Sequence, residues 1–154
     1  MPNYVRNILR IDGENVQDVR DFVSGPYSDF DFNFNKILRE PKTCADWYGW
    51  RVENWRTKWN AVDAQSTEDG YIFDTACSAP LTVIKKLSEL FPKIQFDLTW
   101  ADEDSGQNCG QIIYKNGVEV QWYYPDHAEE VAEIYEECWG RPPFEEECQD
   151  DEIE

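Results

Sequence analysis

Basic side chains are scarce in this sequence of 154 residues: 14 lysines and arginines stand against 32 aspartates and glutamates, for a formal net charge of −18. Binding of DNA or RNA phosphates needs clustered Lys and Arg, so we expect no direct nucleic-acid binding. A charge this far from zero keeps a protein soluble, and it also attracts a basic surface. The composition therefore leaves open general solubility and a role directed at a basic partner.

The sequence also lacks the motifs of common catalytic and cofactor sites. His127 is the single histidine, which excludes a metal site built from several imidazoles. We interpret it as a surface or helix-capping residue beside Asp126. The eight glycines are scattered and form no phosphate-binding loop. We therefore expect no enzymatic activity, no cofactor and no metal.

Apolar runs are short, and none has the length of a membrane span or the character of a signal peptide. The five cysteines are odd in number and include no Cys-x-x-Cys pair. We expect a protein of the host-cell cytoplasm that has no membrane contact. Its cysteines would be reduced and would act mainly as small apolar groups.

Aromatic side chains, by contrast, are abundant: they make up 15% of the residues and include seven Trp. Each buries a large area, so a compact core is expected despite the charge. Alternation of apolar and polar residues predicts strands, and apolar residues at helical spacing predict helices. The strands are expected over 1–12, 30–38, 59–62, 71–76, 94–100, 111–114 and 118–124, and the helices over 16–23, 46–55, 80–91 and 126–139.

This order of elements predicts an α+β fold with a mostly antiparallel sheet and helices packed on one face. The segments between 59 and 124 fit a split β-α-β arrangement of the ferredoxin-like kind. Asn116-Gly117 predicts a tight hairpin turn. We expect residues 1–140 to form one ferredoxin-like domain and residues 141–154 to form an acidic, mobile tail.

The carboxylates concentrate toward the C-terminus, where residues 126–154 hold 13 acidic residues and a single base. A second group follows the strand predicted to end at Trp100. Its glycine spacing does not fit an EF-hand, so we interpret it as a solvated acidic loop. The expected partner-binding residues are Asp97, Asp102, Glu103, Asp104, Glu129, Glu130, Glu133, Glu136 and Glu137.

A Trp-rich block is the most distinctive motif. Residues 51–60 read Arg-Val-Glu-Asn-Trp-Arg-Thr-Lys-Trp-Asn. This block resembles the Glu-Asn-Trp-Gly-Thr-Lys-Trp-Asn segment of the YubB-like, or Api92-like, family of phage and plasmid proteins, with Arg56 in place of Gly. The matching residues are Trp50, Glu53, Asn54, Trp55, Thr57, Lys58, Trp59 and Asn60. Weaker matches are Met1-Pro2-Asn3, Phe30–Ile37, Phe73–Pro80 and Asp102-Glu103 with Gly110.

The resemblance spans residues 1–125 and implies a ferredoxin-like fold and a mobile-element origin, but no assigned activity. Two interpretations of the block stay open. Its tryptophans could fill the core at a corner held by a Glu53–Lys58 pair, or they could line a binding surface. Arg56 puts the conformation of the turn in question, because Gly accepts positive φ and Arg resists it.

These observations lead to the hypothesis of a non-enzymatic binding protein. Its acidic surface would imitate DNA and inhibit a basic, nucleic-acid-binding host protein such as a defence nuclease or a CRISPR complex. The alternative is a nucleic-acid or nucleotide-binding module that uses the Trp-rich block with Arg51, Arg56 and Lys58. An enzyme of an unrecognised type is the third possibility.

Overall fold

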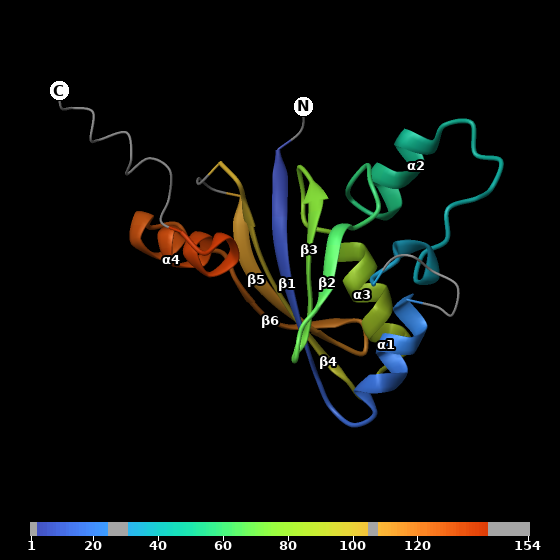
Figure 1. Ribbon diagram of the computed structural model, residues 1–154, viewed down its shortest axis with the longest axis horizontal. Helices are drawn as coiled ribbons and strands as arrows, with labels where there is room; N and C mark the ends of the chain where they lie inside the picture. The colour runs from blue at the N-terminus through green and yellow to red at the C-terminus, as the bar shows by residue number, and fades with distance from the viewer. Residues whose placement is uncertain (1–2, 25–30, 105–107, 142–154) are drawn as a thin grey trace.

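The computed structural model describes residues 3–24, 31–104 and 108–141. Six strands form one antiparallel sheet in the order β2-β3-β1-β4-β5-β6 (Figure 1). The strands are β1 (Tyr4–Asp12), β2 (Val62–Ser66), β3 (Gly70–Ala76), β4 (Gln95–Asp102), β5 (Cys109–Lys115) and β6 (Val118–Tyr123). The helices are α1 (Val16–Ser24), α2 (Trp47–Asn54), α3 (Leu81–Leu90) and α4 (Ala128–Trp139), with a short 3-10 helix, η1, at Phe34–Lys36.

Two interleaved β-α-β units form the first four strands of the sheet. The unit β1-α1-β2 encloses β3, and the unit β3-α3-β4 encloses β1. This is the split β-α-β arrangement, so the predicted ferredoxin-like α+β fold is confirmed. The β5–β6 hairpin extends the sheet beyond β4, and its Asn116-Gly117 turn has the two positive φ angles, 54° and 76°, that such a turn requires.

The main core lies between the sheet and α1 and α3. Leu9, Leu98 and Ile112 face each other across three neighbouring strands and are fully buried. The helices cover these side chains with residues such as Val19 and Leu87, which are also inaccessible to solvent. The helical spacing of apolar residues and the alternation along β4 therefore predicted the core correctly.

Helix α4 lies on the opposite face of the sheet (Figure 1). Its buried Ile134, Tyr135 and Cys138 cluster with Ala101 and Cys109, away from the main core. This corrects the expectation that the helices share one face. The reason is that small residues on the second face of β4 and β5 leave room for a helix there, which alternation along single strands does not reveal.

The segment predicted as a strand over 30–38 is instead a loop with the 3-10 helix at its centre; Phe30 lies outside the described residues. Phe32 and Phe34 are nevertheless fully buried. The backbone N–H of Phe34 donates to the Asn60 side chain, and Asn33 caps the turn by accepting from the Asn35 N–H. Side chains therefore satisfy the backbone here, so no neighbouring strand is needed. Of the predicted tail, 141–154, residues 142–154 lie outside the described residues.

Candidate partner-binding surface

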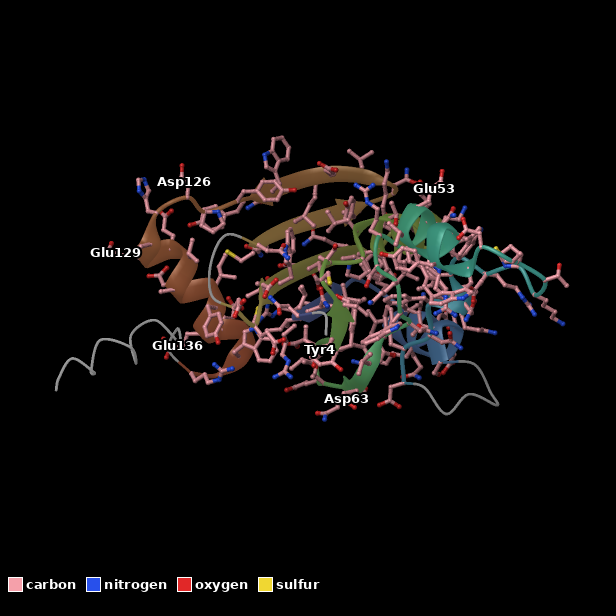
Figure 2. The ribbon with its side chains drawn as sticks, turned by 90° about the horizontal axis from the view of Figure 1, so that it is seen from above. Tyr4, Glu53, Asp63, Asp126, Glu129 and Glu136 are labelled. Carbon is pink, nitrogen blue, oxygen red and sulfur yellow. The ribbon has the colours of Figure 1, made fainter. Side chains whose placement is uncertain are left out.

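Helix α4 places a row of carboxylates on its solvent side. Because its apolar residues face the sheet, the exposed Glu129, Glu133 and Glu136 point the other way. Figure 2 shows Glu129 and Glu136, with Asp126 just before the helix, along the outer side of α4. Glu53 lies at the far end of the molecule in the same view.

Three polar contacts hold α4 on the sheet and on the loop after β4. The Trp139 indole N–H donates to the Ala101 carbonyl at 3.0 Å, and the Tyr135 hydroxyl donates to the Glu103 carbonyl at 3.1 Å. Arg10 on β1 forms an ion pair with Glu137 at 2.8 Å. The carboxylates of α4 are thus carried by a helix fixed along its inner side, which limits the entropy that a partner would have to remove on binding.

The loop after β4 adds a second group of carboxylates. The Glu103 carboxylate accepts the Tyr4 backbone N–H at 2.8 Å. The Asn3 amide donates to Asp102 at 3.2 Å and to Asp104 at 3.1 Å. These donors are neutral, so they order the loop without cancelling its negative charge.

The Tyr135–Glu103 bond joins this loop to α4, and we call the combined surface the acidic end. It consists of Asp102, Glu103, Asp104, Asp126, Glu129, Glu130, Glu133, Glu136 and Glu137. Within the described ranges, Arg10–Glu137 is the only ion pair between Arg or Lys and one of these carboxylates. No cluster of His, Cys, Asp and Glu among the described residues is arranged to hold a metal ion. Most of the negative charge of the acidic end is therefore not balanced by ion pairs among the described residues.

Asp97 lies apart from the loop carboxylates. It is five residues from Asp102 along β4, which corresponds to about 17 Å in a strand. Its two carboxylate oxygens accept from the Gln111 amide at 2.9 and 3.1 Å. The structure therefore brings together eight of the nine predicted partner-binding residues. Asp97 lies opposite Arg10 in the register of β1 and β4, and Arg10 forms the ion pair with Glu137, so Asp97 adjoins the α4 side of the acidic end.

An exposed aromatic edge borders the acidic end, and the sequence interpretation missed it. Every residue of β6 is exposed, including Trp122 at 59%. Tyr123 lies beside the acidic end: desolvation raises the pKa of its hydroxyl, and interactions with Glu130 and Glu133 raise it further. The alternation over 118–124 predicted a strand, but only the strand order reveals that β6 lies at the edge, beyond the cover of α3.

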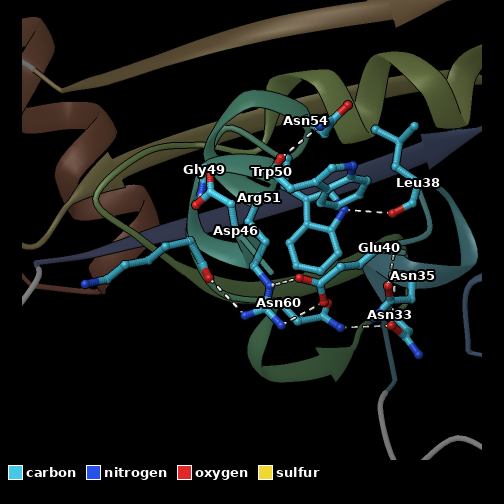
Figure 3. A network of polar contacts seen from close by, with 12 residues as sticks. Asn33, Asn35, Leu38, Glu40, Asp46, Gly49, Trp50, Arg51, Asn54 and Asn60 are labelled. Atoms are coloured by element: carbon cyan, nitrogen blue, oxygen red, sulfur yellow. Dashed lines mark hydrogen bonds and ion pairs between the residues drawn. The ribbon is translucent and has the colours of Figure 1, made fainter. Parts of the chain in front are cut away.

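The Trp-rich block forms a structural corner (Figure 3). Arg51 binds both oxygens of Glu40, at 2.8 and 2.9 Å, and donates to the Lys58 carbonyl at 3.1 Å. The indole N–H of the fully buried Trp55 donates to the Leu38 carbonyl at 2.8 Å. These bonds fasten α2 and the following turn to the segment before α2, which supports the core interpretation of the block.

The remaining family-motif residues serve mainly the same corner. Thr57 is buried and exchanges two hydrogen bonds with the backbone of Ala76, and Asn54 donates to the Trp50 carbonyl. The expected Glu53–Lys58 pair is wrong: Glu53 is exposed, and the Lys58 ammonium lies 5.2 Å from the ring centroid of Trp59. Partly buried motif residues are Trp50, Asn54, Lys58, Trp59 and Asn60.

Two arginines of the corner, Arg51 and Arg56, were singled out in the sequence. Arg51 is engaged by Glu40, which weakens the interpretation of Arg51, Arg56 and Lys58 as a nucleic-acid footprint. Arg56 has φ 67°, so the turn adopts the left-handed conformation that a glycine would accept. The arginine therefore holds a conformation that a glycine, expected here from the resemblance, would adopt without strain.

A comparison with known protein families agrees with this architecture. A family model described as the ferredoxin-like domain in Api92-like protein matches residues 54–139. The crystal structure of the protein api92 from Yersinia pseudotuberculosis is similar, with 14% sequence identity, a TM-score of 0.46, and coverage of 56% of this chain and 32% of that chain. This chain thus spans about a third of the length of that protein. A search of curated proteins finds no match.

Proposed function

The chain belongs to the family of Api92-like proteins through its ferredoxin-like domain, and we propose that it is a non-enzymatic protein whose acidic end engages and inhibits a basic, nucleic-acid-binding protein of the host cell. The observation that carries this proposal is the row of exposed carboxylates on α4, fixed from behind by the contacts to β1 and β4. The proposed partner class is a defence nuclease or a CRISPR complex in the cytoplasm, and the proposed origin is a phage or other mobile element.

The spacing of the carboxylates supports imitation of a nucleic-acid backbone. Glu129, Glu133 and Glu136 are four and three residues apart on one helix. At 1.5 Å of rise per residue, this gives about one carboxylate per 4.5–6 Å of helix axis. One DNA strand presents about one phosphate per 3.4 Å of its axis, which is the same order of charge density. A groove lined with Lys and Arg could therefore bind α4 through a charge density comparable with that of one DNA strand.

The test compares two triple variants of equal net charge. Replacing Glu129, Glu133 and Glu136 with Gln removes three charges from the acidic end. The control replaces the exposed Glu14, Asp18 and Asp21, at and before α1, with Gln or Asn. Both variants carry a net charge of −15 instead of −18. Each protein is tagged and used to capture proteins from nuclease-treated bacterial lysate at low and high salt.

We expect the parent and the α1 control to retain the same basic protein at low salt, to release it at high salt, and to bind it in competition with double-stranded DNA. The α4 triple variant should bind it at least about tenfold more weakly. Equal binding by the two triple variants, or binding that is insensitive to salt, would refute the proposal. Direct binding of single-stranded DNA by the parent at low salt would instead support the nucleic-acid module.

A further inference from the structure

Strand β6 is an open edge with an unusual composition. It is the last strand of the sheet, so one side of its backbone has no neighbouring strand among the residues that the structure describes. Its exposed apolar and aromatic side chains, with those of the residue that follows, are Val118, Val120, Trp122, Tyr123 and Tyr124, at 57%, 52%, 59%, 39% and 54% exposure. Soluble proteins usually blunt such an edge with lysine, proline or distortion, because it templates the addition of another strand.

The other edge of the sheet shows this protection. β2 has only five residues, its pairing with β3 is irregular between Val62 and Gln65, and Asp63 has a positive φ of 53°. β6 also has one register shift, but the stretch from Gln121 to Tyr123 stays in continuous register with β5. Its sequence, Val-Glu-Val-Gln-Trp-Tyr, has no lysine and no proline. β2, with the sequence Val-Asp-Ala-Gln-Ser, also has no lysine and no proline, so the two edges differ mainly in the aromatic side chains of β6 and in the positive φ of Asp63 in β2. These differences favour β6 as the edge to which a strand can be added.

The surroundings of β6 are negative. Glu119 is exposed on the strand itself. Asp126 is three residues beyond the end of β6, and α4 begins at Ala128, so the acidic end continues directly from the C-terminal part of the strand. After desolvation, Glu130, Glu133 and Asp126 also raise the pKa of the Tyr123 hydroxyl. An apolar edge flanked by carboxylates is complementary to a segment that alternates apolar and basic side chains.

We propose that an extended basic segment of the partner adds to the sheet alongside β6 as a seventh strand. Its backbone pairs with the open edge from Gln121 to Tyr123, its apolar side chains contact Trp122 and its neighbours, and its Lys or Arg side chains lie toward Glu119 and the acidic end. This inference rests on the proposed function, since it specifies how the same partner is held. Charge favours this occupant over a second copy, because β6–β6 pairing would join two chains that each carry a net charge of −18.

The probe is a short synthetic peptide in which lysine and valine alternate, titrated into the full chain and followed by fluorescence anisotropy and amide hydrogen exchange. The control peptide has the same sequence but is N-methylated at every residue, which keeps its charge and removes its N–H donors. We expect the parent peptide to protect the amides of residues 118–123 and to bind at least about tenfold more tightly than the control peptide. Equal affinity of the two peptides, no binding, or protection confined to α4 would overturn the strand addition.

A pair of double variants completes the test. V120K/W122K alters β6, and Y48K/V52K makes the same charge change at exposed positions of α2, which are 53% and 42% accessible. Only V120K/W122K should weaken binding of the parent peptide by about tenfold or more. The N-methylated peptide could bind as well as its parent, with only the α4 triple variant failing to bind either peptide. In that case the acidic end binds basic peptides, but no strand is added at β6. Sedimentation of the free chain as a dimer that V120K/W122K dissociates would assign the edge to a second copy and overturn this proposal.

Discussion

Arg51 donates two hydrogen bonds to the Glu40 carboxylate, from Nε to Oε2 at 2.8 Å and from Nη2 to Oε1 at 2.9 Å. The two side chains are only 26% and 16% exposed. The guanidinium also lies 5.0 and 5.2 Å from the ring centroids of Trp47 and Trp55. One arginine therefore links α2 to the segment before it and to two aromatic rings of the Trp-rich block.

Arg51→Met should destabilise the protein by about 1–3 kcal/mol, because the Glu40 carboxylate loses both charged donors in a partly dry site. Arg51→Lys keeps the charge but not the bidentate geometry, so its free energy of unfolding should lie between those of the parent and Arg51→Met. Urea unfolding measures each free energy. The exposed Lys86–Glu89 pair, at 3.7 Å, is the control, and Lys86→Met should change stability by about 0.5 kcal/mol or less. Equal effects at the two sites would contradict the structural role of Arg51.

The same pair predicts a specific dependence of stability on pH. The hydrogen bonds from Arg51 lower the pKa of Glu40 below its ordinary value of 4.5, despite opposing desolvation. A lowered pKa in the folded state gives a stability contribution that is present above about 4.5 and lost as pH falls through the folded-state pKa. The difference between the parent and Glu40→Gln should therefore be constant near neutral pH and shrink below about pH 4.5. A difference that grows in acid would contradict this sign.

Arg56 offers a stabilising substitution. Its φ of 67° costs a non-glycine residue roughly 1–2 kcal/mol. Glycine removes this strain but adds about 0.4–1 kcal/mol of unfolded-chain entropy, so Arg56→Gly should stabilise by about 0.5–1 kcal/mol. Arg39, also exposed but without a positive φ, is the matched control, and Arg39→Gly should be neutral or destabilising. Thermal unfolding of both variants decides the question, and a loss of stability in Arg56→Gly would contradict the strain argument.

The parts of the fold that follow from local rules could be predicted from the sequence. In the first half of β4, buried Phe96 and Leu98 alternate with partly exposed Gln95 and Asp97, and α3 buries one face, so periodicity identified both. Asn116-Gly117 specified its turn because few residue pairs accept two positive φ angles. The Trp-rich motif identified the family, whose model match begins at Asn54.

What could not be predicted depends on contacts between distant segments. Phe32 and Phe34 alternate like a strand, yet Asn60, 26 residues after Phe34, takes the backbone N–H that a ladder would use. The amphipathic pattern of α4 shows that one side is buried but not which face of the sheet buries it. The exposure of Trp122 depends on β6 being last in the strand order. Local sequence carries no information about any of these arrangements.

Trp55 and Trp47 separate the core role of the Trp-rich block from its surface role. Trp55→Phe leaves the Leu38 carbonyl without its 2.8 Å donor and opens space in the core, so it should cost about 2–3 kcal/mol. Trp47 is 46% exposed, and Trp47→Phe should change stability by about 0.5 kcal/mol or less. Chemical denaturation gives both values. Similar small changes at the two positions would mean that Trp55 is not packed as described.

Cysteine reactivity tests whether α4 is docked on the sheet. Burial, with smaller contributions from Glu137 and Cys109, raises the pKa of the Cys138 thiol to about 12, and burial also raises the pKa of Cys109. Cys77 is exposed. Because the thiolate is the reactive form, only about one in ten thousand Cys138 thiols is ionised near pH 8.

We therefore expect iodoacetamide to modify Cys77 rapidly in the native protein and to leave Cys109 and Cys138 unmodified until denaturant is added. Peptide mass spectrometry follows each site separately, and the denatured chain is the control for intrinsic reactivity. The arrangement of the acidic end depends on α4 lying over β4, with Trp139 bonded to the Ala101 carbonyl in the strand and Tyr135 to the Glu103 carbonyl just after it. If Cys138 reacts as fast as Cys77 in the native state, α4 is not held there. The carboxylate row would then lack the fixed backing on which the proposed function relies.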